Sequence, residues 1–285
     1  MSAQGINVTL STASVFPRRC AYAFEMAARL GYDGMEVMVW SDGVTQDATK
    51  LIDLSDKYQI PITSIHAPSL VVSQNVWGVK PAPKLERAVE LAEQVGAATV
   101  VVHPPFAWQP RYAKQFAEHV RFLSEGSGIT IAVENMYPWR RKKRDYLAYL
   151  PHWDPTNQDY DALTLDLSHA STARQNSLVQ AKAFGSRLRH LHLADGSGSA
   201  KDEHLVPGVG TQPCREVLEY LKESGWSGDI AVEIGTRKVD NAAHREALVR
   251  ESLEFARAAL SGARTPELPV AHAQMLNHHP SDAWD

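Results

Sequence analysis

Thr99-Val100-Val101-Val102-His103-Pro104-Pro105 is the stretch that decides the fold. A short β-branched run predicts a strand buried on both faces, and the His-Pro-Pro sequence ends it. The preceding segment 85–95 repeats apolar residues at helical spacing, and Gly96 is its predicted C-cap. A helix that leads into a buried strand is the repeating unit of a parallel α/β protein.

The same alternation of short β-branched runs and helical segments continues along the chain in both directions. It predicts an α/β fold, a single (β/α)₈ TIM barrel with eight parallel strands, and 285 residues are enough for a barrel of roughly 250. The predicted strands are Asn7–Leu10, Gly34–Val39, Pro61–Ile65, Thr99–Val102, Thr130–Val133, Ala162–Leu165, Leu188–Leu193 and Asp229–Val232.

The predicted barrel domain covers residues 1–261. Beyond Ser261-Gly262 the sequence is rich in Pro, His and Ala without periodicity, so residues 262–285 are expected to form a poorly ordered C-terminal tail.

Composition excludes several classes of protein. A net charge of −4 lacks the basic excess of a dedicated nucleic-acid binder. The two cysteines, Cys20 and Cys214, lie far apart, which argues against a disulfide framework or a thiolate zinc site. The sequence shows neither a secretory signal pattern nor an apolar run of membrane-spanning length, so we expect a cytoplasmic protein without a membrane partner.

Polar residues with metal-binding chemistry follow the predicted strands at the end where barrel enzymes keep their active sites. Four carboxylates converging there could stay ionised together only if cations balanced them. Carboxylates mixed with imidazoles suit Zn²⁺ or Mn²⁺, with Mg²⁺ at a carboxylate-rich position, in one to three ions per chain. The candidate ligands are His66, His103, Glu134, Asp166, His169, His192, Asp202, His204 and Glu233.

Other residues near the predicted mouth are candidates for binding substrate. Arg140 and Arg141 begin a run of five cations that could grip a phosphate or could form a solvated loop. Trp108 could line a sugar site, pack a loop or join a homo-oligomer contact. Glu36, in the second strand, could bind substrate or form a buried ion pair. His190 is expected to support His192 or to fill the barrel interior rather than to bind metal.

These residues resemble the xylose-isomerase-like TIM barrel superfamily over about residues Ile6 to Leu260. The superfamily contains sugar phosphate isomerases and epimerases, and also endonuclease IV of AP endonuclease family 2. The sugar enzymes are similar in a four-ligand core that maps to Glu134, Asp166, His192 and Glu233. Endonuclease IV adds ligands that map to His66, His103, His169, Asp202 and His204.

The resemblance implies first a divalent-metal-dependent isomerase or epimerase of a sugar or sugar phosphate, acting through a metal-stabilised enediolate. Glu134 and Glu233 are then the acid and base, and His169 binds a substrate oxygen. The alternative is a trinuclear phosphoester hydrolase of the AP endonuclease class. DNA is the less favoured partner, because Ser69 stands where the endonuclease has an aromatic residue. A barrel that only binds its ligand is the third hypothesis.

Overall fold

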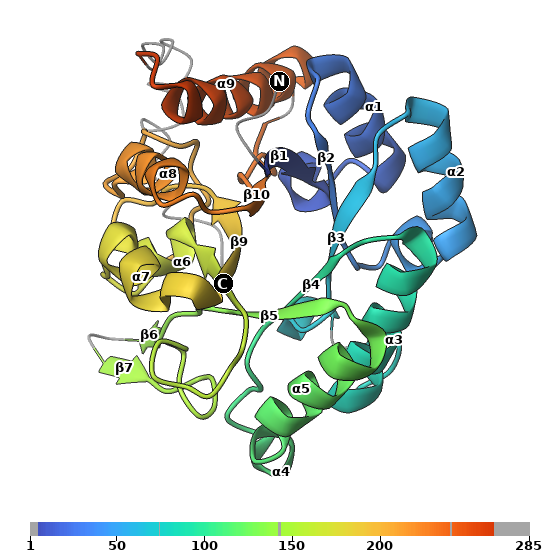
Figure 1. The fold of residues 1–285 in the computed structure, drawn as a ribbon, viewed down its shortest axis with the longest axis vertical. Coiled ribbons are helices and arrows are strands. Elements are labelled where there is room, and N and C mark those ends of the chain that lie inside the picture. Colours follow the sequence, from blue (N-terminus) through green and yellow to red (C-terminus); the bar gives the residue numbers. More distant parts are fainter. Residues whose placement is uncertain (1–4, 74, 142–143, 240, 265–285) are drawn as a thin grey trace.

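Eight parallel strands close into a barrel in the computed structural model, which describes residues 5–73, 75–141, 144–239 and 241–264. Helices surround the strands as an outer ring (Figure 1). The order around the barrel is β1-β10-β9-β8-β5-β4-β3-β2. Its strands are β1 Ile6–Ser11, β2 Gly34–Met38, β3 Ile62–His66, β4 Thr99–Val102, β5 Thr130–Glu134, β8 Leu163–Asp166, β9 Leu188–Leu193 and β10 Gly228–Val232.

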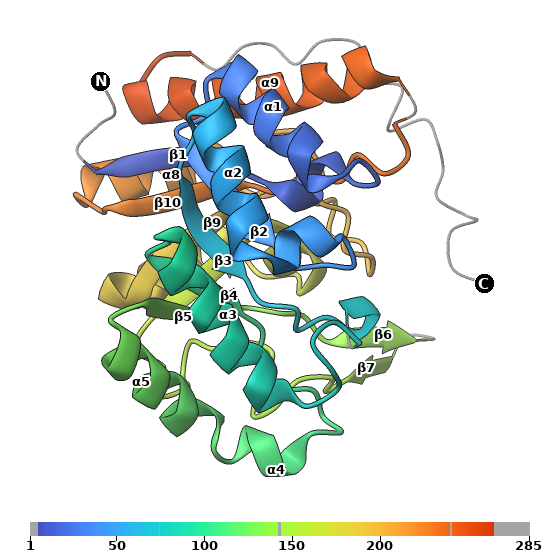
Figure 2. The ribbon, with the colours of Figure 1, turned by 90° about the vertical axis from the view of Figure 1, so that its right-hand side faces the viewer.

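The helices return the chain from one strand to the next, and α1, α2, α3 and α5 lie on the near side in Figure 2. The segment predicted from apolar spacing is α3, whose C-cap Gly96 has φ +74° and donates its N–H to Ala92 and Glu93. The helices are α1 Cys20–Leu30, α2 Ala48–Tyr58, α3 Pro81–Val95, α4 Pro110–Ala113, α5 Phe116–Ser127, α6 Leu167–Thr172, α7 Ser177–Phe184, α8 Cys214–Glu223 and α9 Ala242–Ser261.

The barrel confirms the predicted fold class, and four strands, β1, β3, β5 and β8, extend one residue beyond their predicted ends. His66, Glu134 and Asp166 are the last residues of β3, β5 and β8. Pairing continues through them, because His66 lies opposite Val101 in β4 and Asp166 lies opposite His192 in β9. These side chains are therefore held by the strand ladder rather than by loops.

A hairpin that the sequence analysis did not predict projects from one end of the barrel (Figure 2). Its strands, β6 Trp139–Arg141 and β7 Arg144–Tyr146, pair antiparallel after β5. Three-residue strands in a run of cations offer too little alternation of apolar and polar residues to be recognised from sequence.

The last barrel helix, α9, ends at Ser261, and Gly262 caps it. Most of the predicted tail, residues 265–285, lies outside the described residues. No helix in the described ranges combines the length and the apolar character needed to cross a membrane.

Candidate metal centre

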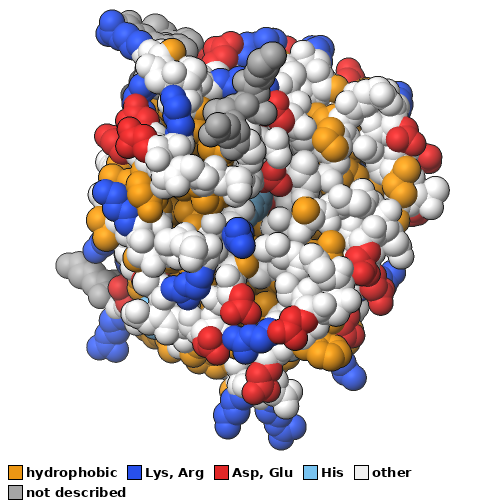
Figure 3. All heavy atoms as spheres, viewed as in Figure 1, with side chains coloured by type: hydrophobic (Ala, Val, Ile, Leu, Met, Phe, Trp, Pro, Cys, Tyr) orange, Lys and Arg blue, Asp and Glu red, His pale blue; other side chains and the backbone are white. Residues whose placement is uncertain are grey.

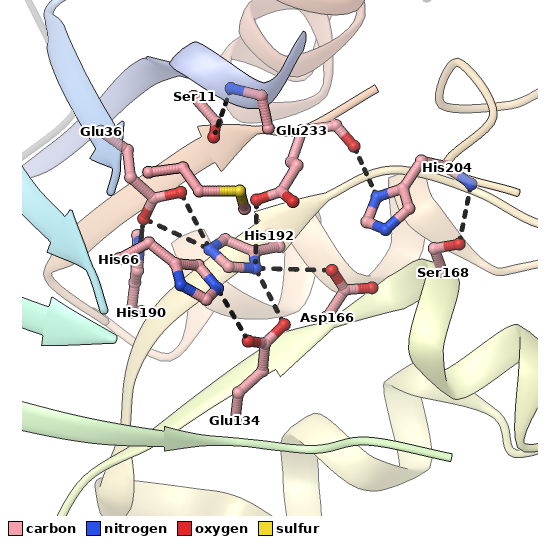
Figure 4. Close-up of polar contacts among 12 residues, drawn as sticks. Ser11, Glu36, His66, Glu134, Asp166, Ser168, His190, His192, His204 and Glu233 are labelled. Atoms are coloured by element: carbon pink, nitrogen blue, oxygen red, sulfur yellow. Dashed lines mark hydrogen bonds and ion pairs between the residues drawn. The ribbon is translucent and has the colours of Figure 1, made fainter. Parts of the chain in front are cut away.

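All nine predicted ligands gather at the mouth formed by the carboxyl ends of the strands. His192 lies at the centre of Figure 4, with Glu36 on one side and Glu134, Asp166 and Glu233 on the other. The Nδ1 atom of His192 is 3.0 Å from Oε1 of Glu134, 3.4 Å from Oδ2 of Asp166 and 3.5 Å from Oε2 of Glu233. We call these four residues the inner group.

The second carboxylate oxygen of Glu134, Oε2, faces two further histidines. The Nε2 atoms of His66 and His103 lie 3.2 and 2.9 Å from Oε2 of Glu134. His66 comes from β3 and His103 follows β4, so neighbouring strands bring both imidazoles to the same carboxylate. The two oxygens of Glu134 therefore face different histidines, and either oxygen could bind a cation.

A third set of ligands lies beside the inner group and is carried by α6 and the loop after β9. The Nε2 atoms of His169 and His204 lie 3.2 and 3.0 Å from Oδ2 of Asp202. We call these three residues the outer group. His204 has a φ of +45°, a strained conformation for a residue with a side chain, and its backbone N–H donates to Ser168 Oγ at 2.9 Å.

In each outer-group imidazole, one ring nitrogen is hydrogen-bonded to a backbone carbonyl oxygen. Nδ1 of His169 lies 2.9 Å from the carbonyl oxygen of Asn135, and Nδ1 of His204 lies 2.8 Å from that of Glu233. A carbonyl only accepts hydrogen bonds, so Nδ1 must carry the hydrogen. The lone pair of each neutral Nε2 then faces Asp202, an arrangement that is repulsive until a proton or a metal ion lies between them.

His66 and His192 are oriented in the same way. Nδ1 of His66 is 3.1 Å from the carbonyl oxygen of Ala67, and Nε2 of His192 is 3.1 Å from the carboxylate of Glu36. Their other nitrogens therefore face Glu134. A histidine whose far nitrogen donates to a carbonyl or carboxylate is the usual arrangement around a bound metal ion.

Glu36 is fully buried inside the barrel. Its carboxylate lies 2.7 Å from Nε2 of His190 and accepts a hydrogen bond from Ser64 Oγ at 3.0 Å. Of the two alternatives for Glu36, this geometry favours the buried ion pair over contact with substrate. His190 touches Glu36 rather than the carboxylates at the mouth, as the sequence analysis expected of a supporting residue.

The pKa shifts of the buried groups show that the carboxylates and imidazoles of the centre stabilise opposite charges on one another. Burial alone lowers the pKa of His204, but the carboxylate of Asp202 outweighs burial and raises the pKa to about 10. The pKa of His192 is likewise raised well above its ordinary value, since Glu36 and other carboxylates overcome burial. The opposite holds for Glu36, whose pKa falls to about 2 despite burial because His192 lies beside it. The carboxylates thus favour a positive charge on His192 and His204.

The residues present fit a divalent cation. Oδ2 of Asp166 and Oε2 of Glu233 are buried and accept no hydrogen bond from the described residues. Buried carboxylate oxygens are costly to leave without a partner. The donor set of imidazole nitrogens and carboxylate oxygens suits Zn²⁺ or Mn²⁺.

Three further residues, Trp108, Arg140 and Arg141, were predicted to bind substrate. The Trp108 ring is 56% exposed and stacks on Phe106 with ring centroids 4.3 Å apart. Arg140 forms an ion pair with Asp145 at 3.0 Å and donates to the carbonyl of Thr172, so two of its contacts are with the protein itself. The side chain of Arg141 lies outside the described part of the structure.

Sequence reasoning missed three residues that hold the ligands in place. The Asn135 side chain exchanges two hydrogen bonds with the backbone of Asp166, at 2.7 and 3.0 Å. Ser168 Oγ donates to Asp202 at 2.7 Å. Asp195 accepts hydrogen bonds from four backbone N–H groups of the loop that carries the outer group. In the sequence, these three residues are marked only by lying close to predicted ligands or, for the loop held by Asp195, by the glycine-rich turn at 208–210.

A family profile described as a xylose isomerase-like TIM barrel matches residues 24–259. An uncharacterised protein of Mycobacterium leprae is 48% identical over 271 residues, which cover 88% of this chain and 97% of that protein. Fructoselysine 3-epimerase of Shigella flexneri is 24% identical over 263 residues, covering 84% of this chain and 92% of the enzyme.

Solved structures share the fold at lower identity. A D-tagatose 3-epimerase-like protein has a TM-score of 0.64 and 23% identity, covering 88% of this chain and 98% of that one. The IOLI protein, whose structure has a bound zinc atom, has a TM-score of 0.64 and 19% identity, covering 91% of this chain and all of that one. With the barrel and most of its length matched, this chain belongs to the xylose isomerase-like TIM barrel family.

Proposed function

We propose that this protein is a divalent-metal-dependent isomerase or epimerase of a sugar or sugar phosphate. The observation that carries the proposal is the inner group, in which Nδ1 of His192 faces three carboxylates within 3.5 Å. The similarity to fructoselysine 3-epimerase, over 84% of the chain, supports sugar chemistry.

Glu134, Asp166, His192 and Glu233 would hold the cation. A divalent ion bound there would polarise a carbonyl and the neighbouring hydroxyl of a sugar, which makes the hydrogen on the carbon between them more acidic. Glu134, Asp166 and Glu233 bring three carboxylates close to one another, and a cation held there would offset their mutual repulsion.

Glu134 and Glu233 are proposed to move the proton. Both carboxylates contact the same atom of His192 but come from different strands, β5 and the end of β10. A substrate carbon held between them would lose its proton to one carboxylate and regain a proton from the other on the opposite face. Inversion at that carbon is the expected result. His169, whose Nδ1 atom lies 3.1 Å from Glu134, is the residue proposed to bind a substrate oxygen.

The test is exchange of a carbon-bound hydrogen with solvent. Metal-free protein is reloaded with Mn²⁺, Mg²⁺, Co²⁺ or Zn²⁺ and incubated in D₂O with a panel of ketoses, aldoses and their phosphates. We expect one substrate class to gain deuterium at the carbon beside its carbonyl and to give an epimer or isomer, only with metal. Turnover without deuterium incorporation, or turnover unaffected by chelation, would contradict this mechanism.

A second candidate is a phosphoester hydrolase with three cations. Two further sets of possible metal ligands favour it, and each set shares one carboxylate with the inner group. His66, His103 and Glu134 form one such set, and Asp166, His169 and His204 form another. The net charge of −4, however, lacks the basic excess that is the usual footprint of a DNA-binding enzyme. On the face seen in Figure 3, where the barrel strands begin, Lys and Arg side chains are likewise scattered among Asp and Glu.

Cleavage of an oligonucleotide with one abasic site separates the two candidates. The isomerase proposal expects no cutting above background. Metal-dependent cutting that His204→Ala abolishes would establish the hydrolase in its place.

A further inference from the structure

A cavity of about 370 Å³ lies beside the metal centre, between the loop after β3 and the loop after β4. Its wall includes His103, whose Nε2 atom is 2.9 Å from Glu134. The cavity is therefore separated from the inner group by a single imidazole. A volume of this size accepts a small organic molecule or one arm of a larger one.

Most of the cavity wall is apolar. Leu85, Val102 and Phe116 line it and are buried in the core, while Val79 and Trp108 lie at its edge and are 70% and 56% exposed. Large apolar side chains exposed around an apolar cavity are typical of a ligand site rather than of ordinary surface.

Lys84 brings one positive charge into this apolar wall. The side chain is 7% exposed, and its Nζ atom donates to the backbone carbonyls of Pro68 and Ser73 at 3.2 and 2.9 Å. No carboxylate of the described residues forms an ion pair with it. An ammonium group has three N–H donors, so one remains for a ligand. A buried cation without a counter-ion is costly, and an anionic ligand would remove that cost.

We infer that this cavity binds the carboxylate of a small organic acid with an apolar body, and that Lys84 is the counter-ion. A monoanionic carboxylate fits the single buried ammonium of Lys84 better than a phosphate ester does, because the other lysine of the lining, Lys80, is exposed to solvent at the edge and would not balance a second buried charge. His103 also lines the cavity, and its buried Nδ1 atom makes no hydrogen bond with the described residues.

The inference is independent of the proposed reaction, because it is tested by equilibrium binding. The full-length protein, both metal-free and zinc-loaded, is titrated with benzoate, its neutral isostere benzamide and phenyl phosphate by calorimetry. We expect benzoate to bind at least tenfold more tightly than benzamide and more tightly than phenyl phosphate. Trp108 at the cavity edge should report binding by a change in fluorescence.

Lys84→Met should remove the preference for benzoate over benzamide and leave benzamide binding within about threefold. Lys80→Met, which removes an equal charge from an exposed position at the edge of the same cavity, should retain the preference. If Lys84→Met does not fold, Val79→Trp at the exposed edge should weaken binding of every aromatic probe without touching the core.

Three results would overturn the inference. They are equal affinity for benzoate and benzamide in the unmodified protein, tighter binding of phenyl phosphate than of benzoate, and a folded Lys84→Met variant that keeps the benzoate preference. If Lys84→Met does not fold, the third result is a Val79→Trp variant that binds the aromatic probes as tightly as the unmodified protein.

Discussion

The inner and outer groups contain the same kinds of ligand but are held by different parts of the fold. Three inner ligands lie within strands and Glu233 directly follows one, and all four are buried, with Glu233 the most exposed at 7%. In the outer group, His169 lies on α6, and Asp202 and His204 lie on a loop, with side chains 21% and 18% exposed. The strand ladder thus determines one group and a loop determines much of the other.

Each group also has its own support. Glu36, on β2, reaches across the barrel to orient His192. The outer loop is instead held by Asp195, whose carboxylate accepts backbone N–H groups including that of Gly210. A Cβ at Gly210 would come within 2.4 Å of that carboxylate, so the turn requires glycine. The proposed catalytic group is therefore built on rigid strands, whereas a loop anchored by Asp195 supplies two of the three outer residues.

The largest expected effect comes from the residue that faces two ligand sets. Glu134→Gln keeps the shape of the side chain but removes the negative charge between His66, His103 and His192. We expect turnover of the sugar substrate to fall about 10²- to 10⁴-fold, the usual contribution of a positioned acid or base. Glu90→Gln on the exposed face of α3 is the matched control. Activity within tenfold of the unmodified protein would show that the inner group is not catalytic.

Glu36→Gln tests the support of the inner group while leaving every proposed ligand unchanged. Loss of the charge that orients Nε2 of His192 should weaken metal binding about 10- to 100-fold, as is typical when such a supporting carboxylate is changed. Competition with a chelating dye measures the affinity. An unchanged metal affinity, in a variant with normal circular dichroism, would show that the barrel ladder alone orients His192.

His204→Ala tests whether the outer group takes part in the reaction. If the inner group does the chemistry, sugar turnover should fall less than about tenfold, while any ion held by the outer group is lost from elemental analysis. A loss of turnover as large as that of Glu134→Gln would contradict the division into two groups and would favour a reaction that needs all the ligands.

The smallest effect is on the pH dependence of stability. The pKa of His204 is raised to about 10 in the folded protein, above the ordinary value of 6.5. Its contribution to the stability of metal-free protein is therefore fully present below pH 6.5 and is lost as the pH rises towards 10. Melting curves between pH 6 and 10 should show a decline that is shallower in His204→Ala. Saturating zinc should stabilise the protein more at higher pH, because metal competes with protons for imidazole. If the melting temperature of metal-free protein falls equally steeply with pH in the unmodified protein and in His204→Ala, His204 does not contribute to this pH dependence.

Much of the fold and the list of candidate ligands could be read from sequence, because both depend on local patterns. Four β-branched residues predicted β4, and polar residues at the ends of the third to eighth strands marked the mouth of the barrel. The ligand roles stay predictions, although the structure brings all nine side chains together. Lys84 was not recognised, because a lysine on a helix gives no local sign that it is buried.

The sequence by itself therefore determined the alternation of strands and helices and the chemistry at each strand end, since spacing and residue type are local properties. The tertiary structure alone decided which ring nitrogen of each histidine faces a carboxylate, that Glu36 supports His192, and that a buried lysine lines a cavity beside His103. Those relations join residues far apart in the chain, and only closure of the barrel fixes their distances.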